Sequence, residues 1–131
     1  MQYATRDTQN ENYLNPLGYK KLIAWQKSDL LAHSVYDLTF NFPKEEVFGL
    51  TSQIRRAVIS IVANIVEGYS RNSKKEFHHF LSISLGSLAE AEYFLEFAFK
   101  RGYIAKADFE NTLQLKIEVG QLVWKLYLSQ K

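Results

Sequence analysis

The sequence predicts an all-α protein in which four helices form an antiparallel up-and-down bundle. Glycine and proline are rare, with six and two among 131 residues, which favours long helices over many short strands. Apolar residues recur at spacings of three, four and seven along four segments of the chain. The connections between these segments are short, so neighbouring helices should run antiparallel.

A change in composition near residue 18 divides the chain into two parts. Residues 1–18 are rich in Gln, Asn and Thr, and we expect them to form a flexible N-terminal arm. Asn15, Pro16 and Gly18 indicate the entry to the folded part, so residues 19–131 should form the bundle domain. A domain of this size can bury about two thirds of its unfolded surface, which is enough for one core.

The first two helices are bounded by proline and glycine. The first helix should run from about Lys20 to Phe40, because Pro43 prevents its continuation. The second helix should begin within residues 43–53 and end near Glu67, with Gly68 as a left-handed cap.

The third and fourth helices have clearer ends. Ser73 followed by Glu76 is the capping-box pattern, and apolar periodicity starts at once. This helix should reach Lys100, before Gly102. The fourth helix should begin at residues 106–108 and extend nearly to the C-terminus.

The second predicted helix is apolar around most of its circumference and carries one narrow polar seam. At about 100° per residue, the five seam residues fall within an arc of about 80°. The seam consists of Gln53, Arg56, Ser60, Asn64 and Glu67. One apolar side consists of Ile54, Val58, Ile61 and Ile65, and another of Ile59, Val62 and Val66. Two apolar sides predict a partner beyond the bundle, most simply another copy of the chain, although a wide core would also explain them.

The polar seam has two interpretations. Its side chains could satisfy one another as a buried network that fixes the register of the helices. Alternatively, Arg56, Asn64 and Glu67 could line a shared groove and contact a ligand.

The third helix contributes one further residue to this hypothesis. Gly86 in its middle costs about 1 kcal/mol relative to alanine, so we expect another helix to approach it closely. Glu90, one turn later, could then reach Arg55 or Arg56 across that contact.

Three stretches resemble a known family. They are TSQIRRAVISIVANIVEG at 51–68, LIAWQKSDLLAHSVYDLTFNFPKEE at 22–46 and FHHFLSISLGSLAEAE at 77–92. They resemble the four-helix bundle proteins encoded in intervening sequences of bacterial large-subunit ribosomal RNA genes, relatives of the accessory protein of diversity-generating retroelements. The chain departs from the family at Ile61-Val62, where alanine and proline are frequent, and at Val66, where alanine is frequent.

The resemblance carries its own expectations. It implies a bundle that assembles into a homo-oligomeric ring, typically a pentamer, in the cytoplasm of a bacterium. The retroelement relative is held to bind nucleic acid and a reverse transcriptase through a basic surface, which suggests RNA contact here.

The charge balance is only slightly basic. Sixteen basic and fourteen acidic residues give +2, so charge alone does not indicate nucleic-acid binding. The candidate nucleic-acid contacts are local basic residues at helix ends, namely Arg55, Arg71, Lys74 and Lys75.

The residue inventory argues against catalysis, a cofactor or a metal. The chain has no cysteine and three histidines. Glu76 and His79 supply half of a di-iron bundle motif, but the fourth helix has no histidine to complete it. No apolar run approaches the roughly 20 residues that span a bilayer, so we expect no membrane segment.

Together these features predict a non-catalytic, homo-oligomeric helical scaffold that contacts RNA or another nucleic acid through its basic residues. The expected partners are further copies of the chain and either RNA or a nucleic-acid enzyme. The alternative is a purely structural or protein-binding oligomer with no nucleic-acid role.

Overall fold

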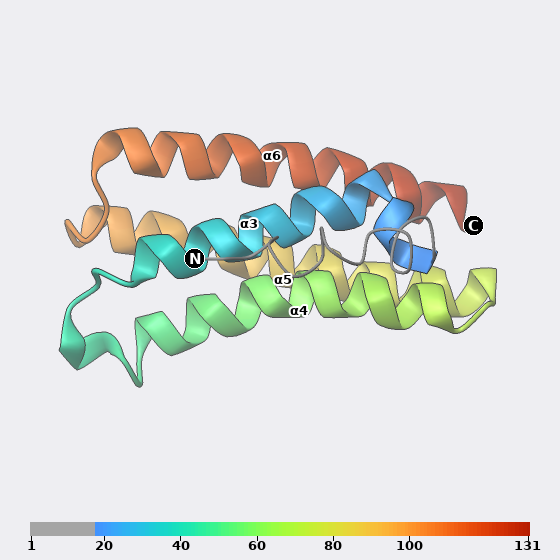
Figure 1. Ribbon diagram of the computed structural model, residues 1–131, viewed down its shortest axis with the longest axis horizontal. Coiled ribbons are helices and arrows are strands. Elements are labelled where there is room, and N and C mark those ends of the chain that lie inside the picture. Colours follow the sequence, from blue (N-terminus) through green and yellow to red (C-terminus); the bar gives the residue numbers. More distant parts are fainter. Residues whose placement is uncertain (1–17) are drawn as a thin grey trace, which may run out of the picture.

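The computed structural model describes residues 18–131, within which four long α-helices pack together as one bundle (Figure 1). These helices are α3 (Ile23–Thr39), α4 (Leu50–Ser70), α5 (Lys74–Lys100) and α6 (Lys106–Ser129), and two short 3-10 helices are η1 (Gly18–Lys21) and η2 (Lys44–Glu46). The predicted all-α bundle is confirmed. The predicted arm lies outside the described residues except for Gly18, which begins η1.

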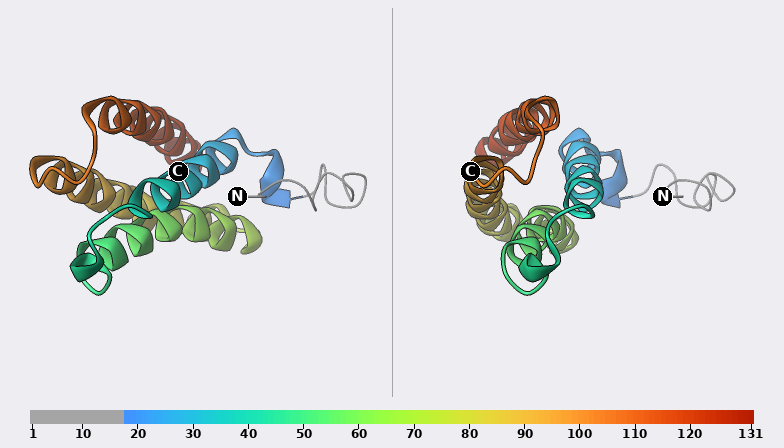
Figure 2. Two further views of the ribbon diagram at one scale, coloured as in Figure 1. Left: turned by 60° about the vertical axis from the view of Figure 1, so that its left-hand side comes forward. Right: turned by 90° about the vertical axis from the view of Figure 1, so that its left-hand side faces the viewer.

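Each long helix packs against two neighbours around a shared core. The contacting pairs are α3 with α4, α4 with α5, α5 with α6, and α6 with α3. Figure 2 shows this order around the bundle axis, and Figure 1 shows that consecutive helices run in opposite directions. The up-and-down arrangement places the start of α3, the α4–α5 turn and the end of α6 at the same end of the bundle.

The core is made by one side of each helix. Its largest fully buried apolar side chains are Leu31, Val35, Ile54, Val58, Ile61, Ile65, Leu81, Leu95, Val119 and Val123. The α4 members of this set are the first apolar side predicted from the sequence. None of the helices in residues 18–131 combines the length and apolar content needed to cross a membrane.

Hydrogen bonds define the starts of α4 and α5. The Ser73 hydroxyl accepts from the Glu76 backbone N–H at 3.3 Å, as the capping pattern predicts. The Glu46 carboxylate accepts from the Leu50 backbone N–H at 3.1 Å and from the Tyr103 hydroxyl at 2.9 Å. These two bonds, with the Leu50 bond contributing most, hold the pKa of Glu46 below its ordinary value.

Gly68 does not end α4, and this corrects the sequence prediction. The helix continues to Ser70, and the left-handed residue is Asn72, with φ of 56°. A Cβ on Gly68 would lie 2.8 Å from Phe77 Cδ1 and 2.9 Å from Phe80 Cβ. The glycine is therefore needed for the close approach of α5, not for a turn.

Gly86 also departs from its prediction. No atom lies within 4 Å of the Cβ position built on this residue, so no helix of the same chain approaches it. The expected intramolecular contact at Gly86 is wrong. Its side of α5 faces outward because the core side of this helix passes through Ser84, Ser87 and Leu88.

Candidate functional site

The middle of the polar seam is satisfied within the chain. The Asn64 side-chain amide donates to the Ser60 carbonyl oxygen at 2.8 Å and to the Ser60 hydroxyl at 3.1 Å. The Ser87 hydroxyl of α5 donates to the Ser60 hydroxyl at 2.8 Å, and buried Ser84 donates to the Ile61 carbonyl oxygen at 2.8 Å. These small side chains join α4 to α5 and leave the Ser60–Asn64 part of the seam engaged in packing.

The ends of the seam face outward. Gln53, Arg56 and Glu67 are exposed, and so is Glu90 on α5. The ion pairs among residues 18–131 include none between Glu90 and either Arg55 or Arg56, and Glu67 pairs with Arg71 instead. Within one copy, these charged side chains therefore do not gather into a common groove.

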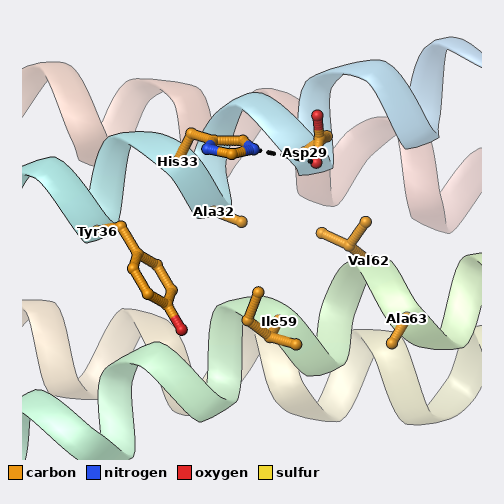
Figure 3. A pocket seen from close by; sticks show the side chains of 7 residues that line it. All are labelled: Asp29, Ala32, His33, Tyr36, Ile59, Val62 and Ala63. Carbon is orange, nitrogen blue, oxygen red and sulfur yellow. Dashed lines mark ion pairs between the residues drawn. The ribbon is translucent and has the colours of Figure 1, made fainter. Parts of the chain in front are cut away.

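A groove opens on the other side of α4, between α4 and α3 (Figure 3). It has a volume of about 420 Å³ and is mostly apolar. Its lining residues are Asp29, Ala32, His33, Tyr36, Ile59, Val62 and Ala63. Ile59 and Val62 belong to the second apolar side predicted for this helix, and Ile59 remains 47% exposed in one copy.

Asp29 gives the groove a polar element that the sequence analysis did not single out. Its side chain is only 15% exposed, and Oδ1 lies 3.6 Å from His33 Nε2. Oδ2 is buried and has no hydrogen-bond partner among residues 18–131. Burial raises the pKa of this carboxyl above its ordinary value, and the nearby His33 opposes the rise.

The predicted basic residues fall into two separate places. Arg55 is held at the start of α4, where its Nε donates to Thr39 Oγ1 at 2.8 Å and its Nη2 donates to the Tyr36 carbonyl oxygen at 3.2 Å. Its guanidinium also lies 4.5 Å from the centre of the Tyr36 ring. Arg71 directly follows the end of α4, sixteen residues after Arg55, or about 24 Å at 1.5 Å per residue. Arg55 is thus not part of one patch with Arg71, Lys74 and Lys75.

The cluster at the α4–α5 turn is only partly free to meet an anion. Arg71 Nε lies 2.8 Å from Glu67 Oε2, and its Nη1 lies 3.4 Å from Glu76 Oε1. Lys74 and Lys75, in the first turn of α5, are exposed and make no ion pair within residues 18–131. The available positive charge of this cluster therefore comes from the two lysines.

Comparison with known proteins assigns the chain to a protein family. The sequence profile of the 23S rRNA-intervening sequence proteins matches residues 20–125, a range that includes most of all four helices. The chain belongs to this family. The resemblance noted from the three motifs is therefore confirmed at the level of the family, while the relation to the retroelement accessory protein stays a prediction.

A similar fold is seen in a solved structure. A crystal structure from Bacteroides thetaiotaomicron, described as a protein of unknown function from the S23 ribosomal protein family, matches with a TM-score of 0.73 and 27% sequence identity. The match covers 80% of this chain and 95% of that one. No curated protein matches the chain.

Proposed function

We propose that the chain is a non-catalytic scaffold that assembles into a homo-oligomeric ring and binds RNA through lysines at the start of α5. The observation that carries this proposal is the apolar surface that one copy leaves open. Thirteen large apolar side chains of residues 18–131 are exposed, including Phe48 at 96% and Phe40 at 82%. A surface of this kind is typical of an interaction site.

Two of these apolar surfaces lie at different places on the chain, which favours a ring. One is the α3–α4 groove around Ile59, and the other is the connection between the same helices, with Phe40, Val47 and Phe48. A contact between two different surfaces of identical copies is heterologous, and a repeated heterologous contact closes into a ring when the rotation permits. A covering copy could also supply the hydrogen-bond donor that Asp29 Oδ2 lacks. The pentameric size follows from the family resemblance.

The RNA part of the proposal rests on Lys74 and Lys75. Both are exposed and make no ion pair within the described chain, and they stand where α5 begins, so backbone N–H groups add to the positive potential. A ring repeats the pair once per copy, and weak contacts then sum.

The ion pairs of Arg71 with two glutamates favour a second candidate function. Because Glu67 and Glu76 both pair with this arginine, the cluster is less basic than its sequence indicates. The alternative is therefore an oligomer that is purely structural or binds a protein partner and has no nucleic-acid role.

Light scattering coupled to size exclusion tests the assembly. The native protein should elute as a multiple of its 15.2 kDa chain, and Ile59→Glu should shift it to the mass of one chain. Ile117→Glu is the matched control, since Ile117 is similarly exposed, at 42%, but lies on α6 away from the groove. A native protein with the mass of a single chain at micromolar concentration would overturn the proposed ring.

RNA binding is tested by fluorescence anisotropy with a labelled single-stranded RNA over a series of salt concentrations. The affinity should fall with salt, with a slope of about 0.7 log units per phosphate contact. Lys74→Glu with Lys75→Glu should weaken binding and reduce the slope. Lys100→Glu with Lys106→Glu, at the other end of the bundle, is the matched control. Failure of the native protein to bind at low salt would favour the alternative function.

A further inference from the structure

Three aromatic rings stack where α5 and α6 pair near the C-terminus. The centre of the His78 ring lies 3.9 Å from that of Tyr127, with 22° between the ring planes. The Trp124 ring lies 5.3 Å from the same Tyr127 ring, with 24° between planes. Two rings are therefore stacked on Tyr127, and together they form one cluster, which we call the aromatic stack.

The aromatic stack is fixed on one side and open on the other. His78 Nε2 is buried and has no hydrogen-bond partner among residues 18–131, so ring stacking is the contact that orients the imidazole. Trp124 is 51% exposed, which leaves much of its indole facing solvent. A large, rigid and exposed π surface on regular helices loses little conformational entropy when another ring covers it.

Acidic side chains are sparse around the aromatic stack, and Glu76, two residues before His78, pairs with Arg71 at 3.4 Å. Residues 77–89 of α5 and residues 119–131, which include the end of α6, contain no Asp or Glu. Lys75 lies three residues before His78 on α5, so the two share a helix face. Lys131 is exposed and lies two residues beyond the end of α6 at Ser129. Lys74 and Lys125 add positive charge at the same end of the bundle. The combination of the exposed Trp124 indole with exposed lysines that make no ion pair within residues 18–131 is complementary to a base and its phosphates.

We propose that the aromatic stack is a platform for a base of single-stranded RNA, with Trp124 as the stacking surface and Lys75 and Lys131 beside the phosphates. This inference rests on the proposed function and identifies the class of nucleic acid and the residues that contact it. Bases stack on aromatic side chains through their π faces, which any base can present, so binding should tolerate many sequences. A duplex would not fit, because its bases are already stacked and paired.

The test uses the full-length protein and a short labelled oligo(A) RNA. Trp124→Ala should weaken binding by about tenfold, which corresponds to the loss of one stacked base. Trp124→Phe keeps a π surface and should retain most of the affinity. Ile117→Ala removes an exposed apolar side chain on the same helix, two turns earlier, and should leave the affinity unchanged. The salt slope should stay the same in Trp124→Ala, since stacking releases no counterions, whereas Lys75→Glu should reduce it.

Tryptophan fluorescence provides an independent reading of the contact. The chain has two tryptophans, Trp25 and Trp124. In a Trp25→Phe background, titration with oligo(A) should quench the emission of Trp124. Equal binding by the native protein and Trp124→Ala, with no quenching, would overturn the platform and leave the proposed function intact.

Two other results would also overturn the platform. If the native protein binds no RNA at low salt, both the platform and the proposed RNA function fail. If Trp124→Ala lowers the mass of the assembly, the aromatic stack is instead a contact between copies of the chain.

Discussion

The two sides of α4 differ in how completely they are packed. Toward α5, Gly68 brings the backbones close, and the hydroxyls of Ser84 and Ser87 bond across the contact. Toward α3, a groove of about 420 Å³ remains, and Ile59 is 47% exposed at its edge. Both sides are rich in Ile and Val, so apolar content does not distinguish them. On the α5 side, Gly68, Ser84 and Ser87 close the contact within one copy. On the α3 side, the hydrogen bonds of Arg55 lie near the start of α4 and leave the groove open.

The largest expected effect on stability comes from comparing a buried and an exposed isoleucine of α4. Ile61→Ala, at a position 1% exposed, should lower the free energy of unfolding by about 3 kcal/mol, because the cavity cannot be filled. Ile59→Ala should change it by about 0.5 kcal/mol or less in a single copy. Urea unfolding at several protein concentrations measures both.

Concentration separates the folding of one copy from its assembly. If a second copy covers the α3–α4 groove, the cost of Ile59→Ala should grow with protein concentration, whereas most of the cost of Ile61→Ala is already present in one copy. Equal effects of the two substitutions at low concentration would contradict the difference between the two sides.

The next effect concerns the two glycines of the α4–α5 pair. Gly68→Ala should destabilise the protein by about 2 kcal/mol, because overpacking against Phe77 and Phe80 outweighs the gain in helix propensity. Gly86→Ala should stabilise it by about 1 kcal/mol, because its Cβ meets no atom within 4 Å. Thermal unfolding monitored by circular dichroism measures both, and destabilisation by Gly86→Ala would instead indicate a neighbouring copy at that position.

These glycines also show where the sequence was sufficient and where it was not. Helix number and order followed from periodicity, and the Ser73 cap and the stop at Gly102 followed from local chemistry. Gly68 was misassigned because a glycine that permits a turn and one that permits close packing look alike in a sequence. Gly86 was misassigned because the sequence does not show that its side of α5 faces away from the other helices of the chain.

A smaller effect tests the hydrogen-bonded part of the polar seam. Asn64→Ala removes both bonds to Ser60 and should cost about 1 kcal/mol, the usual net value of a lost hydrogen bond. Gln53→Ala, at an exposed position of the same seam, should change the free energy of unfolding by about 0.5 kcal/mol or less. Chemical denaturation of the two variants compares them, and an equal cost would show that the bonds to Ser60 contribute nothing.

The candidate sites were predictable only in part. The sequence indicated that one helix has a second apolar side, and Ile59 and Val62 do line the groove. It gave no reason to single out Asp29, because an acidic residue on a helix is usually solvated. It gave no reason to place Trp124 and Tyr127 near His78, since that contact depends on how α5 and α6 are aligned.

The smallest effect comes from Asp29 in the groove and depends on pH. Burial raises the pKa of this carboxyl in the folded protein above its ordinary value of 3.8, so the folded state holds the proton more tightly than the unfolded chain. Burying the ionised Asp29 side chain therefore lowers the stability of the folded protein. This loss of stability is fully present above the pKa of Asp29 in the folded protein and disappears as the pH falls toward 3.8. Asparagine imitates the protonated form, so Asp29→Asn should be slightly more stable than the native protein at neutral pH.

The difference in stability between the native protein and Asp29→Asn should narrow on acidification. Thermal unfolding, measured from neutral pH down to a pH below the ordinary aspartate pKa of 3.8, checks this. Asp37→Asn, an exposed position on α3, controls for the loss of one negative charge from the helix. His33, 3.6 Å from Asp29, opposes the effect of burial on the pKa of this carboxyl and so reduces the difference. If instead the native protein were the more stable one and lost its advantage in acid, the ion pair with His33 would outweigh burial. The polar part of the groove would then be complete in one copy, and only its apolar part would need a cover.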